Sequence, residues 1–138
     1  MVSAYVLPEI TAPFRASLVE NRGDILLLKA ENQDQHARRR SQIWEKPPLS
    51  KATERLYEAA ARWYRQALEI HPQSIAALNG LGVCLVGLQR YQEAAEVFRK
   101  ALTVLPTGEI YLNLGIAYYR GGEHTRAREA WEKGRKVK

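Results

Sequence analysis

The sequence predicts an all-α protein in which helical hairpins repeat along the chain and stack side by side. The first observation is a set of residues in the 138-residue chain that recurs after 34 positions. The second is a further copy displaced by 33 positions. The third is that apolar residues inside the copies follow the spacing of a helix. Units of this length are typical of stacked repeat proteins rather than of one closed core.

The repeat is carried by aromatic, small and proline positions. The first copy recurs in the second as follows: Tyr57, Ala60, Tyr64, Ala67 and Pro72 become Tyr91, Ala94, Phe98, Ala101 and Pro106. The second recurs in the third as follows: Leu78, Leu81, Gly82, Leu85, Ala94, Phe98 and Ala101 become Tyr111, Leu114, Gly115, Tyr118, Ala127, Trp131 and Gly134. We expect the glycines and alanines to let helices approach closely, and the aromatic rings to fill the space that remains.

The N-terminal extension, residues 1–23, contains Pro8 and Pro13 and ends in a segment that favours a turn, Asn21-Arg22-Gly23-Asp24. A short helix from Ala12 to Glu20 is predicted. The alternative is a β-hairpin across the turn, but Leu, Lys and Ala residues after it favour a helix.

A helix is predicted from Asp24, as its N-cap, to Trp44, and Pro47-Pro48 breaks it. Ser50 can cap the next helix, which runs to about Ile70 and ends at His71-Pro72. Together these two helices form a degenerate first repeat, residues 24–73, and the helix from Asp24 caps the stack.

Two more hairpins follow, and they give the second repeat, residues 74–106, and the third, residues 107–138. The second combines an apolar stripe on 75–88 with another on 94–102, joined by a tight turn near Tyr91. The third starts at Pro106-Thr107-Gly108 and turns at Gly121-Gly122.

Composition predicts a single soluble domain with a cytoplasmic location. Apolar residues make up 46% and charged residues 26%, and no stretch has the length or composition of a secretory signal or a membrane span. A lone cysteine, Cys84, lies among apolar neighbours and fits a buried thiol in a reducing compartment. The net charge of +6 gathers at Arg38-Arg39-Arg40 and in the C-terminal tail, where interspersed acids indicate a solvated helix face.

These motifs resemble the tetratricopeptide repeat family. The matching strings are Leu78-Asn79-Gly80-Leu81-Gly82, Tyr91-Gln92-Glu93-Ala94 and Phe98-Arg99-Lys100-Ala101-Leu102 followed by Pro106. The resemblance implies a right-handed solenoid of about 2.5 to 3 repeats with an N-terminal helical cap. It also implies a non-catalytic scaffold, assembly factor or chaperone-like adaptor that binds a helix or extended peptide of a partner protein in a concave groove. The implied groove residues lie on the first helix of each repeat: Asn79, Val83, Val86, Leu112, Ile116 and Tyr119.

Three alternatives remain open for the surfaces of this solenoid. The N-terminal segment, with Tyr5, Val6, Leu7 and Phe14, can fill the groove itself. The end of the stack at Trp131 can pair with a second copy of the chain. The basic clusters can hold nucleic acid or an acidic partner, although no aromatic residues alternate with the basic ones as a stacking platform requires.

We expect no catalytic residue, metal ion, cofactor or membrane insertion. His36, His71 and His124 are far apart and lack the spacing of metal ligands. Gly80-Leu81-Gly82 lies inside a helical pattern and does not follow a strand, as a phosphate-binding loop would.

Overall fold

A computed structural model describes residues 12–40 and 48–137, and every regular element in these residues is an α-helix. This confirms the prediction of an all-α solenoid. The helices, in chain order, are α1 Ala12–Arg40, α2 Lys51–Ile70, α3 Ile75–Gly87, α4 Tyr91–Val104, α5 Gly108–Arg120 and α6 His124–Lys136.

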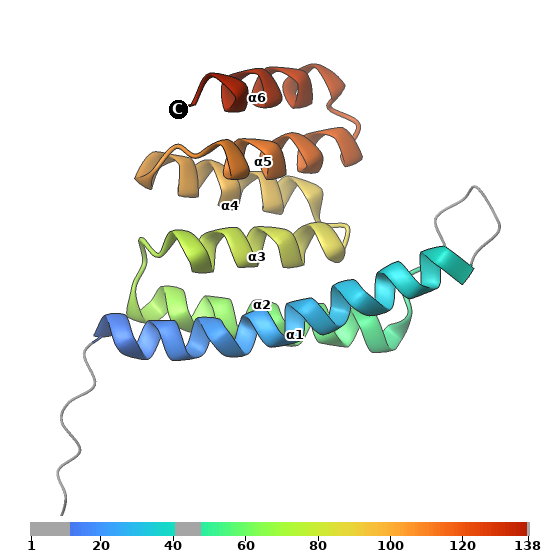
Figure 1. Ribbon diagram of the computed structural model, residues 1–138, viewed down its shortest axis with the longest axis vertical. Helices are drawn as coiled ribbons and strands as arrows, with labels where there is room; N and C mark the ends of the chain where they lie inside the picture. Colours follow the sequence, from blue (N-terminus) through green and yellow to red (C-terminus); the bar gives the residue numbers. More distant parts are fainter. Residues whose placement is uncertain (1–11, 41–47, 138) are drawn as a thin grey trace, which may run out of the picture.

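The six helices form three hairpins that stack along one axis. Each helix packs against the next one in the chain, and the first helices of consecutive hairpins also contact each other, α1 with α3 and α3 with α5. Figure 1 shows α1 in front of α2 and α5 in front of α4, with the hairpins piled from α1 to α6. We call the side formed by α1, α3 and α5 the first-helix face and the opposite side, formed by α2, α4 and α6, the second-helix face.

Side-chain hydroxyls cap three of the helices. Ser50 accepts a hydrogen bond from the backbone N–H of Thr53 at 3.1 Å, as its predicted role requires. Ser74 and Thr107 do the same at the starts of α3 and α5. These bonds satisfy N–H groups that have no partner within the helix, so α2, α3 and α5 each begin at a position fixed by the sequence.

The turns inside the second and third hairpins share one backbone form. Gln89 has φ of 63° and Gly122, one repeat later, has φ of 86°. Glycine adopts this left-handed conformation without steric cost, whereas glutamine does not. The Gly121-Gly122 turn is therefore confirmed and explained by the backbone it must adopt.

Aromatic rings of the second helices lie on glycines of the first helices. A Cβ atom added to Gly82 would come within 2.4 Å of the Phe98 ring, and one added to Gly115 within 2.1 Å of the Trp131 ring. Phe98, Ala94 and Ala127 have no exposed surface. The predicted alternation of small and large residues is thus confirmed.

The predicted turn at residues 21–24 is wrong, and so is the β-hairpin alternative. α1 runs without interruption for 29 residues, and Asp24 is not its N-cap. A Cβ on Gly23 would lie 2.9 Å from the ring of Tyr64, so this glycine serves close helix packing and not a turn. The Tyr64 hydroxyl donates to the Asp24 carboxylate at 2.5 Å, and this contact between α1 and α2 outweighs the local turn preference.

Several predictions fall partly or wholly outside the described residues. These include the helix between Arg40 and Trp44, and Tyr5, Val6, Leu7 and the side chain of Phe14 as a segment that fills the groove. The domain divisions after residues 23, 73 and 106 stay predictions, and α1 passes through the first of them.

We expect Gly82→Ala to lower the free energy of unfolding by roughly 1–3 kcal/mol, because the new methyl group overpacks the joint with Phe98. The direction of this change is informative, because a glycine-to-alanine substitution in an unconstrained helix raises the free energy of unfolding by about 0.5–1 kcal/mol. Urea unfolding measures the change.

The pairing is tested by adding Phe98→Leu, which should make the double variant less unstable than the sum of the two single ones. Gln92→Ala on the exposed side of α4 is the control. A neutral or stabilising effect of Gly82→Ala would contradict the packing.

Candidate protein-binding face

Two contiguous hollows of about 250 and 190 Å³ open on the first-helix face between α1, α3 and α5. They share four lining residues, Glu31, Val83, Val86 and Arg120. The larger one extends along α1 past Asp34, and the smaller one extends along α5. We call the two hollows together the first-helix groove.

Half of the predicted site residues form the floor of this groove. Val83 and Val86 come from α3 and Ile116 from α5, so consecutive hairpins contribute to one apolar surface. Val86 is only 8% exposed, whereas Val83 and Ile116 are half-buried. The remaining three predicted residues are not among those that line the two hollows.

Asn79 lies where the second and third hairpins meet. Its side-chain oxygen accepts from the Asn113 amide at 2.8 Å, and its own amide donates to Glu109 at 3.1 Å. Asn113 also lines the smaller hollow. Asn79 therefore acts in the structure as a bridge between α3 and α5.

Leu112 and Tyr119 lie toward α6 and are 52% and 54% exposed. Trp131 packs over Gly115, donates its indole N–H to the Leu112 carbonyl at 3.2 Å, and has its ring centroid 5.9 Å from that of Tyr119. Pairing of this end with a second copy of the chain stays a prediction.

The sequence analysis missed the charged residues of the groove, Glu31 on α1 and Arg120 on α5. A signal for Arg120 was its position four residues after Ile116, which places both on one side of a helix. The signal for Glu31 was the spacing of Ala16, Gly23 and Ala30, seven residues apart and all buried, which marks the packed side of α1.

Burial raises the pKa of the Glu31 carboxyl above its ordinary value of 4.5. Burial also raises the pKa of the Cys84 thiol to about 12, with the nearby Glu31 carboxylate as the second cause. Cys84 is therefore a packed, unreactive side chain at neutral pH, as predicted. Burial removes part of the hydration of the Glu31 carboxylate, so its charged form is disfavoured.

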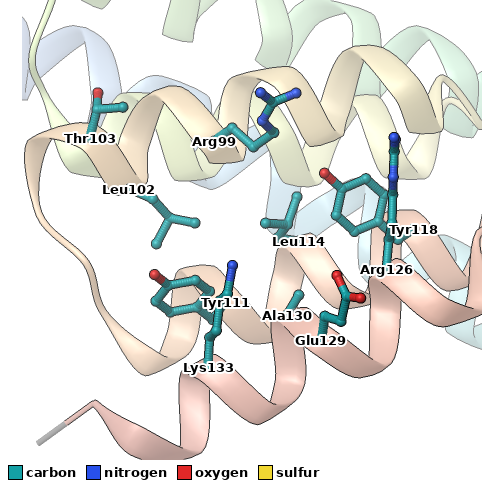
Figure 2. A pocket seen from close by; sticks show the side chains of 10 residues that line it. All are labelled: Arg99, Leu102, Thr103, Tyr111, Leu114, Tyr118, Arg126, Glu129, Ala130 and Lys133. Atoms are coloured by element: carbon teal, nitrogen blue, oxygen red, sulfur yellow. The ribbon is translucent and has the colours of Figure 1, made fainter.

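A larger hollow, about 460 Å³, lies on the second-helix face between α4 and α6. Figure 2 shows the surrounding side chains, with Arg99 on the α4 side and Arg126, Glu129 and Lys133 on the α6 side. Arg126 forms an ion pair with Glu123 at 2.7 Å. Glu123 and Glu129 thus offset much of the positive charge at this hollow, and it contains no predicted site residue.

No described helix is long and apolar enough to cross a membrane. Among residues 12–40 and 48–137, no three His, Cys, Asp or Glu side chains are grouped so that they could hold a metal ion.

The described hairpins stack with aromatic rings on glycines, and a groove runs along their first helices. These features define a helical-repeat protein with a surface on which another molecule can bind. Family models described as tetratricopeptide repeat match residues 51–107 and 109–133. The chain belongs to the tetratricopeptide repeat family. Repeats of this family are non-catalytic and generally mediate protein–protein interactions. No curated protein matched the sequence.

We expect Glu31→Gln to raise the melting temperature at neutral pH, because glutamine removes a partly desolvated charge. The raised pKa means that the stabilising, protonated form is fully present below pH 4.5 and is lost as the pH rises through the folded-state pKa. The difference between variant and wild type should therefore vanish in acid and grow toward pH 7, as thermal unfolding at several pH values would show. Glu96→Gln on α4 is the matched control, and a lower melting temperature for Glu31→Gln at pH 7 would contradict the assignment.

Proposed function

We propose that this protein binds a segment of another protein, an amphipathic helix or an extended peptide, in the first-helix groove. The observation that carries the proposal is the apolar floor of Val83, Val86 and Ile116, which joins two hairpins and opens to solvent. A partner that covers this floor with its own apolar side chains gains about 25 cal/mol for each Å² of apolar surface removed from water.

The role that fits this groove is that of a scaffold or an assembly factor. Binding by shape and apolar contact requires no reacting group, and helix-in-groove recognition is a recurring mode for such surfaces. A cytoplasmic location agrees with the buried free thiol of Cys84, which needs no oxidising compartment.

The clamp that some family members use for the C-terminal carboxylate of chaperone tails has weak support in this chain. It depends on cationic and amide side chains along the first helices, whereas the available positions hold Asn79, Val83, Leu112 and Ile116. The amides of Asn79 and Asn113 are committed to the contact between hairpins. An apolar partner segment therefore suits the groove better than a free carboxylate.

Val83→Glu and Ile116→Glu should each weaken the binding of groove ligands at least tenfold, because a carboxylate would be desolvated against the apolar partner. Peptides selected from a random display library on the immobilised wild-type chain provide the ligands, and fluorescence anisotropy measures their affinity. Circular dichroism should show unchanged helical content.

The matched control is Val104→Glu, which makes the same change at an exposed position at the end of α4. Selected peptides that bind both groove variants as tightly as the wild type would refute the groove as the binding site.

A further inference from the structure

We infer that the first-helix groove selects partner segments by a charge pattern as well as by apolar contact, and so fixes the direction in which they lie. The segment carries a lysine or arginine on the α1 side and an aspartate or glutamate on the α5 side, with apolar residues between them. This inference rests on the proposed function.

The first support is the position of two opposite charges at one apolar floor. Glu31 belongs to α1 and Arg120 to the last turn of α5, and both line both hollows together with Val83 and Val86. A ligand that covers the two valines therefore passes within reach of a carboxylate on one wall and a guanidinium on the other.

The second support is that neither charge is neutralised within the described chain. Among residues 12–40 and 48–137, no side-chain hydrogen bond or ion pair engages Glu31 or Arg120, whereas Arg90 and Arg126 each pair with a glutamate three residues away. Burial raises the pKa of the Glu31 carboxyl, as expected for a carboxylate that has lost part of its hydration. A partly desolvated carboxylate without a counter-charge gains most from a cation that the ligand brings.

The third support is the contrast between this wall and the remaining surface. The chain has a net charge of +6, yet Glu31 places a carboxylate on the α1 side of the groove. An acidic wall on a basic protein attracts a basic side chain locally, while the surrounding positive charge disfavours a partner that is basic throughout.

The test uses the full chain and a random-peptide display library, and it retains only peptides whose binding is abolished by Val83→Glu. The retained peptides are expected to share apolar positions flanked by Lys or Arg on one side and Asp or Glu on the other. Glu31→Gln and Arg120→Gln should each weaken them on the order of fivefold to tenfold, and more salt should reduce the difference. Glu96→Gln and Arg128→Gln are the matched controls and should leave the affinities unchanged.

A charge exchange then tests direct pairing. Glu31→Lys should bind poorly to a retained peptide and regain affinity when the Lys or Arg of that peptide is changed to Glu. Groove-dependent peptides without the charge pattern, or with affinities that neither Glu31→Gln nor Arg120→Gln changes, would overturn the inference and leave the proposed function standing. A selection that yields no groove-dependent peptide would overturn the proposed function itself.

Discussion

The fold depends on one contact that recurs in every hairpin, an aromatic ring on the second helix lying against a glycine on the first. Tyr64 meets Gly23, Phe98 meets Gly82, and Trp131 meets Gly115. Because the missing side chain leaves room for one ring, the contact sets both the separation and the register of the two helices. Residues that follow these glycines on α3 and α5 are thereby turned to the same face, and this places Val83 beside Ile116.

Tyr64 has a wider role than the other two rings, because it also lies against Gly80 of the next hairpin. Its ring joins α1, α2 and α3, and its hydroxyl donates to Asp24. Burial and that carboxylate raise the pKa of the Tyr64 hydroxyl, so it remains a hydrogen-bond donor. This one residue therefore holds α1 against the repeats and positions the acidic wall of the groove.

The second and third hairpins could be predicted from sequence because their packing partners lie close along the chain. Phe98 follows Gly82 by 16 positions, and Trp131 follows Gly115 by the same number, so the pattern repeats visibly. In the first hairpin Tyr64 follows Gly23 by 41 positions, and a glycine between Arg22 and Asp24 has the local composition of a turn. Only the long-range contact shows that this glycine packs against a ring.

The sequence distance between packing partners also explains which residues of the candidate site could be predicted. The family resemblance, carried onto the clear repeats by helical phase, predicted that Val83, Val86 and Ile116 share one floor, and each follows a packing glycine by a short distance on the same helix. The placement of Glu31 depends on how α1 packs against α2. Tyr64 sets that packing, and it lies far from α1 in the sequence. Leu112 and Tyr119 share the phase of Ile116, but their exposure depends on whether another helix covers them, which phase alone does not determine.

The amide bridge from Asn113 through Asn79 to Glu109 has a consequence for how ligands enter. It ties α3 to α5 along the edge of the groove before any ligand arrives, so the two hairpins present a preorganised surface. Less conformational entropy is then lost on association, and more of the contact energy appears as affinity. A short stack of repeats can in this way act as a rigid receptor, with the adjustment of shape left to the incoming chain.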